Sequence, residues 1–276
     1  MTDSISKNIP TAMTVAGSDS GGGAGIQADL RTFAFHRVHG CTAITCVTAQ
    51  NTLGLTRVDA LPAAAVVAQI ETVLTDIDVQ AAKTGMLLNQ EIITVVAEQL
   101  ARFNLNQLVV DPVMVSRTGA PLIDEKAIAA LKNLLIPLAV IVTPNLYEAQ
   151  ILSGLEIHTL DDMRLAAERI YQLGAKAVVV KGGGLPGKQR GIDIWFDGNR
   201  SEVLQTTTVD TKNTHGTGCT LSAAIAANLA LGKDLLSAVR LAKYYVTAAL
   251  HSALDIGQGT GTVRHFYPLM SSADRW

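Results

Sequence analysis

Residues 210–219 read DTKNTHGTGC, and a run of small residues, TLSAAIAANLALG, follows directly. This pattern predicts a glycine-rich loop at the N-terminal end of a helix, where consecutive backbone N–H groups can bind an anion. Gly216 and Gly218 have no side chain that would block a phosphate, and His215 lies inside the same segment. Such N–H groups can stabilise the charge that develops on a transferring phosphoryl group.

Cys219 occupies the first turn of this predicted helix. A free thiol has a pKa near ~8.5, and a position at a helix N-terminus lowers it. Cys219 could then accept a proton from a substrate hydroxyl group. The alternative is a small core residue that packs against the Ala-rich helix, and the residues alone leave both interpretations open.

A second group of polar residues has the composition of a magnesium site. In VTPNLYEAQ (142–150), Asn145 and Glu148 are three residues apart, so both would lie on one face of a helix that begins after Pro144. An amide and a carboxylate suit Mg²⁺ with its shell of waters, and Asp111, before Pro112, could face the same ion. The alternative is a capping box that satisfies the N–H groups of the helix itself.

The segment GSDSGGGAG (17–25) would let the backbone approach a ligand closely. It is not a P-loop, because no Gly-Lys-Ser/Thr follows, and not a nucleophile elbow, because Asp19 stands where a serine is required. Asp19 could accept hydrogen bonds from a hydroxyl group or an amine. The alternative is a flexible turn with a helix-capping Asp or Ser.

The segment GGGLPG (182–187) matches the dinucleotide fingerprint literally. A strand-like sequence follows it where the fingerprint needs a helix, so a nicotinamide oxidoreductase is disfavoured. Lys181, at the end of the preceding strand, could contact phosphate oxygens. A solvated surface lysine is the alternative.

Alternating patterns predict the elements that position these residues: short β-branched runs for strands and longer apolar-periodic stretches for helices. Strands are expected at 12–18, 41–50, 79–85, 107–113, 139–145 and 176–183, with a hairpin at 191–209 that turns at Asp197-Gly198. Helices are expected at 26–36, 62–77, 89–103, 124–136, 147–154, 161–174, 217–231 and 234–252.

Repeated strand–helix units indicate an α/β fold with a mostly parallel sheet that helices cover on both faces. Ligands bind at the carboxyl ends of such strands, and the polar segments all lie there. The sequence therefore predicts one large site built from seven loops, which read SDSGGGAG, TAQN, TGM, DPV, TPNLYE, KGGG and DTKNTHGTGC. No break in composition divides the chain, so we expect a single domain over 1–276 with its core at about 12–267 and short loose termini.

Composition narrows the class of partner. Hydrophobic residues make up 48% of the 276 residues, charged residues 17%, and the formal net charge is −2. No basic cluster is available for nucleic acid or an anionic membrane, and no signal peptide or membrane span is expected. Three cysteines without metal or disulfide spacing indicate free thiols in a reducing cytoplasm.

Seven segments in this order resemble the hydroxymethylpyrimidine/phosphomethylpyrimidine kinases of thiamin biosynthesis. They are AGSDSGGGAGIQADLRTF, VTAQNT, KTGML, DPVMV, TPNLYEA, VVVKGG and NTHGTGCTLSAA, within residues 13–267. The resemblance implies a ribokinase-like three-layer α/β/α sandwich, a homodimer, and ATP- and Mg²⁺-dependent phosphorylation of 4-amino-5-hydroxymethyl-2-methylpyrimidine and then of its monophosphate. The rival functions are a pyridoxine/pyridoxal kinase on the same fold and a non-catalytic pyrimidine sensor.

The resemblance also implies roles for single residues. It places the pyrimidine at Gly17, Asp19, Ala24, Met86 and Val113, with Gln50 on its aminopyrimidine edge. It assigns Asp111 and Glu148 to the metal, Asn145, Lys181 and Thr211 to ATP, residues 215–218 to the anion site, and Cys219 to the proton acceptor. Ser116 stands where some pyridoxal-active relatives carry a cysteine, which puts pyridoxal phosphorylation in doubt.

Overall fold

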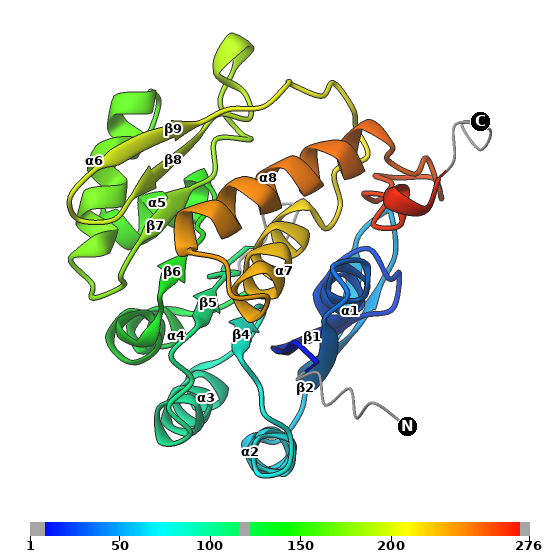
Figure 1. Ribbon diagram of the computed structural model, residues 1–276, viewed down its shortest axis with the longest axis vertical. Helices are drawn as coiled ribbons and strands as arrows, with labels where there is room; N and C mark the ends of the chain where they lie inside the picture. The colour runs from blue at the N-terminus through cyan, green and yellow to red at the C-terminus, as the bar shows by residue number, and fades with distance from the viewer. Residues whose placement is uncertain (1–8, 116–121, 271–276) are drawn as a thin grey trace, which may run out of the picture.

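The computed structural model describes residues 9–115 and 122–270. Its strands form one sheet in the order β3-β2-β1-β4-β5-β6-β7-β8-β9 (Figure 1). The six strands from β2 to β7 are parallel, and β3, β8 and β9 are antiparallel to their neighbours. The strands are β1 (Thr11–Asp19), β2 (His39–Gln50), β3 (Leu55–Ala60), β4 (Ala81–Thr84), β5 (Leu108–Val110), β6 (Ile141–Val142), β7 (Val178–Val180), β8 (Asp193–Phe196) and β9 (Ser201–Leu204).

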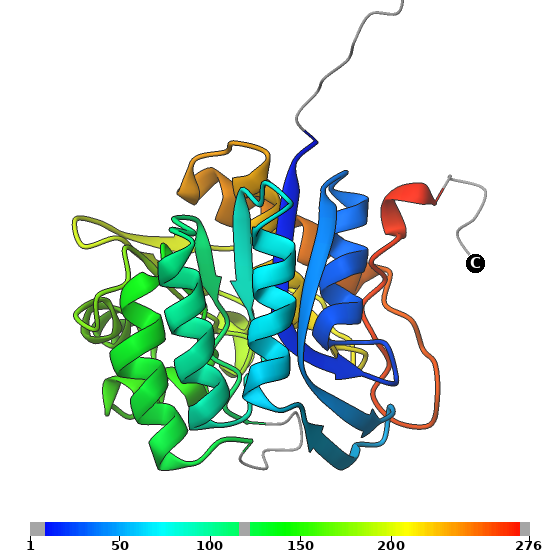
Figure 2. The ribbon, with the colours of Figure 1, turned by 90° about the horizontal axis from the view of Figure 1, so that it is seen from below.

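Helices cover both faces of this sheet, as Figure 1 shows end-on and Figure 2 from the side. One layer contains α1 (Gly25–Phe35), α7 (Thr217–Ala230) and α8 (Leu235–His251). The other contains α2 (Ala63–Leu74), α3 (Gln90–Arg102), α4 (Glu125–Ala130), α5 (Leu146–Ser153) and α6 (Leu160–Tyr171). The predicted three-layer α/β/α arrangement is confirmed.

The short central strands are apolar because both of their faces are buried. In β5, Leu108 and Val110 join the core under α2–α6, whereas Val109 joins the core under α1, α7 and α8. Every residue of α7 from Thr220 to Ala230 is buried. Its small side chains therefore allow this helix to lie between the sheet and its neighbours.

Most predicted elements are present with shifted ends, and two differ in kind. The helix expected at 124–136 is α4 followed by a π-turn over Leu131–Leu135 and a 3-10 turn over Ile136–Leu138. Pro137 explains the ending, because it cannot donate a helical hydrogen bond. The edge strand β3 was not predicted, since LTRVDA is mostly exposed and lacks an apolar run.

Two local predictions concern the segment after β7. The hairpin of β8 and β9 turns at Asp197-Gly198, where Gly198 has a φ of +89°. A short 3-10 turn at Gly187–Gln189 and then β8 follow GGGLPG, so no helix is available for a dinucleotide there. Within residues 9–115 and 122–270, no helix is long and apolar enough to cross a membrane.

Candidate active site

A cavity of about 240 Å³ opens at the carboxyl ends of the parallel strands. All seven predicted loop segments contribute to its wall, so the expected convergence of these loops is confirmed. The predicted site residues that line the cavity are Gly17, Asp19, Ala24, Gln50, Met86, Asp111, Val113, Asn145, Glu148, Lys181, His215, Gly216, Gly218 and Cys219. Thr211 does not line it, and its hydroxyl accepts a hydrogen bond from the Asn213 N–H at 3.1 Å. Ser116 lies outside the described residues.

The N-terminal end of α7 opens into this cavity without a capping side chain. Its N-cap, Gly216, has a φ of +85°, and a Cβ at this position would lie 1.8 Å from the Gly23 carbonyl oxygen. Only glycine allows the two loops to approach so closely. Among the described residues, no acceptor is present for the backbone N–H groups of Gly216, Gly218 and Cys219.

The predicted anion site over 215–218 is therefore displaced along the chain. The His215 N–H already donates to the Gly261 carbonyl at 3.1 Å, and the Thr217 N–H donates to the Thr214 carbonyl at 3.3 Å. The available donors are instead those of Gly216, Gly218 and Cys219. They remain free because the first turn of a helix has no intrahelical acceptors.

Cys219 lies on the cavity wall, but its predicted acidity is wrong for the ligand-free site. Burial raises the pKa of the thiol to about 11, and the nearby Asp29 and Asp111 carboxylates oppose the lowering effect of Lys83. The helix N-terminus does not overcome this cost of desolvation. Cys219 is thus a thiol at neutral pH, and Cys41, Cys46 and Cys219 are all free.

Opposite the α7 amides, Asp111 and Lys181 form an ion pair. Lys181 Nζ lies 3.1 Å from Asp111 Oδ1, and Ser222 donates to Asp111 Oδ2 at 3.2 Å. A Cβ on Gly218 would lie 3.3 Å from Lys181 Nζ. The cation and the free amides therefore border the same space, which is the arrangement that a phosphate needs.

Asn145 and Glu148 form the capping box that was the alternative reading. The Asn145 side chain accepts from the Glu148 N–H at 3.0 Å, and Glu148 Oε2 accepts from the Asn145 N–H at 2.8 Å. Both residues nevertheless line the cavity. Burial raises the pKa of Glu148 to about 7; Lys181 lowers it and Asp111 raises it. One pair of residues thus caps α5 and presents a carboxylate to the site.

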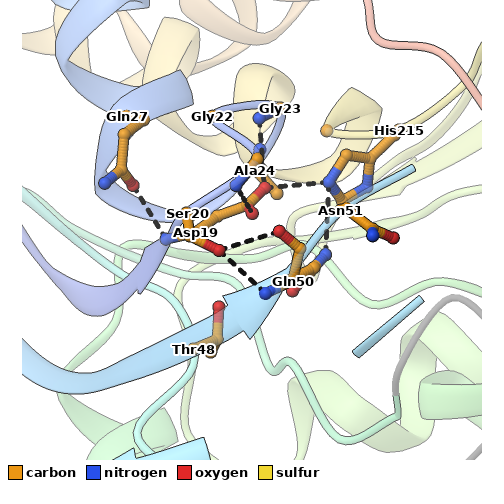
Figure 3. A network of polar contacts seen from close by, with 12 residues as sticks. Asp19, Ser20, Gly22, Gly23, Ala24, Gln27, Thr48, Gln50, Asn51 and His215 are labelled. Atoms are coloured by element: carbon orange, nitrogen blue, oxygen red, sulfur yellow. Dashed lines mark hydrogen bonds and ion pairs between the residues drawn. The ribbon is translucent and has the colours of Figure 1, made fainter. Parts of the chain in front are cut away.

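The Asp19 carboxylate organises the glycine loop (Figure 3). Oδ1 accepts from the Gly21 N–H at 2.8 Å, and Oδ2 accepts from the N–H groups of Gly23 and Ala24 at 3.0 and 2.8 Å. Burial alone would raise the pKa of Asp19, but the bonds from His215 and these amides outweigh it and lower the pKa. Asp19 thus forms the turn that was the alternative, and because it also lines the cavity, its contact with substrate stays a prediction.

His215 connects the two halves of the site. Its Nε2 lies 2.9 Å from Asp19 Oδ2 and 3.2 Å from Gln50 Nε2 (Figure 3). The imidazole therefore lies on the side of the glycine loop, not at the free amides of α7. Its predicted catalytic role stays a prediction, and Gln50 lies beside it in the cavity wall.

A buried ion pair that was not predicted from the sequence reaches the cavity wall through Lys83. Lys83 Nζ in β4 lies 2.9 and 2.8 Å from the two carboxylate oxygens of Asp29 in α1, and both side chains are fully buried. The Thr14 hydroxyl donates to the same carboxylate at 2.6 Å. The sequence does contain a sign of this pair, because a charged residue in the otherwise apolar strand VQAAKTG is unusual.

Comparison with known proteins identifies this arrangement. The family model described as phosphomethylpyrimidine kinase matches residues 19–264. The chain belongs to the phosphomethylpyrimidine kinase family. It is 59% identical to the hydroxymethylpyrimidine/phosphomethylpyrimidine kinase of Synechococcus elongatus over 95% of this chain and 99% of the relative.

Solved structures resemble this member of the phosphomethylpyrimidine kinase family over most of its length. The ADP complex of Bacillus subtilis pyridoxal kinase matches with a TM-score of 0.86 and 41% identity, over 92% of this chain and 96% of the other. Pyridoxal kinase from Staphylococcus aureus in complex with AMP-PCP and pyridoxal matches with a TM-score of 0.86 and 36% identity, over 92% and 93%.

The space between Gly218 and Lys181 gives a first prediction for this kinase. Gly218→Ala places a methyl group 3.3 Å from Lys181 Nζ and should lower kcat roughly 100-fold by misplacing the phosphoryl group. Stability should stay constant or rise by up to ~1 kcal/mol, because Gly218 is helical. Gly183→Ala is the matched control, since no heavy atom lies within 4 Å of its added Cβ. Equal kcat values for both variants would contradict a phosphoryl group bound between Gly218 and Lys181.

Glu148 gives a second prediction, on stability against pH in EDTA. Its pKa is raised from 4.5 to about 7 on folding, so the folded state holds the proton more tightly between these values. The contribution of Glu148 to stability should therefore fall as pH rises through this window, by on the order of 3 kcal/mol, and stay level above it.

The matched variant Glu148→Gln keeps a capping side chain but cannot ionise. Urea unfolding at pH values between about 4.5 and 8 should show this variant gaining stability relative to the wild type as pH rises. Parallel curves for the two proteins would show that Glu148 does not carry this proton.

Proposed function

We propose that the chain is an ATP-dependent kinase that phosphorylates 4-amino-5-hydroxymethyl-2-methylpyrimidine to its monophosphate and then the monophosphate to the diphosphate. The observation that carries this proposal is that the free amides of α7, Lys181 and Cys219 share one cavity with Gln50 and the glycine loop. The 59% identical relative carries the name of this activity.

One half of the cavity suits the acceptor. Gly17, Ala24, Met86 and Val113 provide a largely apolar wall for a flat ring. Gln50 lines this half of the cavity, so its side-chain amide can pair with the exocyclic amine and ring nitrogen of an aminopyrimidine. This arrangement supports a small aminopyrimidine in preference to a large substrate.

The other half suits the donor. Lys181 and the N–H groups of Gly216, Gly218 and Cys219 would surround the terminal phosphate of ATP, which spreads its charge over hydrogen-bond donors. Burial lowers the pKa of Lys181, but Asp111 and Glu148 outweigh it, so its pKa is raised and the group stays a cation. The roles of Asn145 and Thr211 toward ATP stay predictions.

Asp111 and Glu148 fit a magnesium ion as a pair of nearly buried carboxylates in the same cavity. Among the described residues, no group of three or more His, Cys, Asp or Glu side chains could hold a metal ion. A pair of carboxylates nevertheless suits Mg²⁺, because this ion keeps most of its waters and also binds substrate phosphates. When bound, the ion would offset phosphate charge.

The hydroxymethyl oxygen bonds to the γ-phosphorus, the bond from that phosphorus to the bridging oxygen breaks, and the electron pair leaves with ADP. The hydroxyl proton passes to the Cys219 sulfur in its minor thiolate form. In the second phosphorylation the acceptor is an ionised phosphate oxygen, which has no proton to lose.

A third prediction follows from this difference. Cys219→Ala should slow the first phosphorylation by roughly 100-fold or more, which is the usual contribution of a general base, and slow the second much less. Single-turnover measurements with each acceptor test it. Equal loss in both steps would reject the simple base role.

Pyridoxal phosphorylation is the second candidate, because two solved structures with a TM-score of 0.86 are named pyridoxal kinases. A coupled ADP-release assay with the hydroxymethylpyrimidine, its monophosphate and pyridoxal at equal concentrations separates the two. We expect the highest kcat/KM for the two pyrimidines. A higher value for pyridoxal would favour the second candidate, and binding without ADP release would indicate a sensor.

The resemblance also supports a homodimer and a cytoplasmic location. Sedimentation of the purified chain tests the first, because a monomer at micromolar concentration would contradict it.

A further inference from the structure

Two helix ends that lack capping side chains meet at Cys219. Neither Gly216, which precedes α7, nor Ala24, which precedes α1, makes a side-chain cap. Other helices of the fold are capped, for example α3 by Asn89 and α8 by Asp234. α1 and α7 pack against each other (Figure 1), and the Gly25 N–H at the start of α1 lowers the pKa of the Cys219 thiol.

A buried cation lies in the same wall. Lys83 Nζ makes both of its hydrogen bonds to Asp29, so among the described residues its third N–H has no acceptor. Nζ lies 3.0 Å from the position of a Cβ on Gly85, and Lys83, Gly85 and Cys219 all line the cavity. Asp29 lies four residues after Gly25, on the same face of α1.

The charged groups around Cys219 act in opposite directions. Burial raises the pKa of the thiol most, Lys83 lowers it, Asp29 and Asp111 raise it, and the Gly25 N–H lowers it. Lys181 also lines the cavity, but it is paired with Asp111 and is the group that would bind phosphate. When Lys181 binds phosphate, Lys83 is thus still able to stabilise negative charge on the Cys219 sulfur.

We propose that Lys83 is a positioning residue for Cys219: its ammonium group, fixed by Asp29 and Thr14, favours negative charge on the sulfur when the acceptor hydroxyl loses its proton. The catalytic part of this inference rests on the proposed function. The effect of the Lys83 charge on the Cys219 thiol concerns the ligand-free protein and does not depend on the proposed function.

A second buried ion pair, between Lys243 and Asp193, has different contacts from the pair of Lys83 and Asp29. Lys243 Nζ in α8 contacts Asp193 Oδ2 at 2.6 Å and donates to the Gly191 carbonyl at 2.8 Å, so it also bonds to the backbone. Neither Lys243 nor Asp193 lines the cavity. Among the described residues, the Lys83 ammonium group bonds to no backbone group, and Lys83 borders the space where chemistry would occur. A buried ion pair is by itself weak evidence for a gain in stability.

The test measures the rate constant for alkylation of Cys219 by iodoacetamide against pH in the full, ligand-free chain. Peptide mass spectrometry resolves Cys219 from the buried Cys41 and Cys46, and Cys219→Ala supplies the blank. Because only the thiolate reacts, the rate follows the thiolate fraction, and one unit of pKa is a tenfold change.

Lys83→Met should slow alkylation at a fixed pH by at least about tenfold, since it removes the favourable charge but keeps the length of the side chain. Asp29→Asn should accelerate it by at least about threefold, because the opposing anion is lost. Lys243→Met, the matched control, should stay within about twofold of the wild type. A role in packing alone would not produce effects of opposite sign.

Two results would overturn the proposal: Lys83→Met and Asp29→Asn moving the rate in the same direction, or Lys243→Met reproducing the effect of Lys83→Met. If Lys83→Met does not fold, Asp29→Asn decides, and an unchanged or lower rate rejects the proposal.

In the working enzyme Lys83→Met should lower kcat for the hydroxyl acceptor about tenfold with little change in KM. Absence of any phosphoryl transfer by the wild type would instead reject the proposed function.

Discussion

The site depends on the Asp19 carboxylate, which joins segments that are distant in sequence. It accepts three N–H groups of its own loop and contacts His215, which is 196 residues away in the chain. These bonds hold the glycine loop against the start of α7, where the Gly23 carbonyl lies too close to Gly216 for any side chain. This contact therefore sets the position of the glycine loop relative to the free amides of α7, whose helix is itself held by its buried residues.

The cavity concentrates buried charge that a stable fold does not need. Lys83, Asp29, Asp111 and Glu148 are each at most 3% exposed, and removing such groups from water is costly unless they are paired. Each has a partner: Asp29 for Lys83, Lys181 for Asp111, and the start of α5 for Glu148. The pairs offset the cost of burying these charges, and they set the proton affinities of the site.

Local chemistry explains which predictions from sequence were confirmed. The alternation of β-branched runs with helical stretches gave the order of elements, because burial on both faces of a parallel sheet requires continuous apolar residues. Asn145 and Glu148 were readable as a capping box because both partners are three residues apart. β3 could not be predicted because its stability comes from pairing with β2, not from an apolar pattern of its own.

The sequence by itself determined where backbone freedom, helix starts and reactive side chains occur, since each depends on residues within a few positions of one another. Only the tertiary structure decided which charges face one another. The pairing of Lys83 with Asp29, the turn of His215 toward Asp19, and the burial that raises the pKa of Cys219 all arise from contacts across different strands and helices. Electrostatic energies depend on distance and burial in space, so no local pattern in the chain could have fixed them.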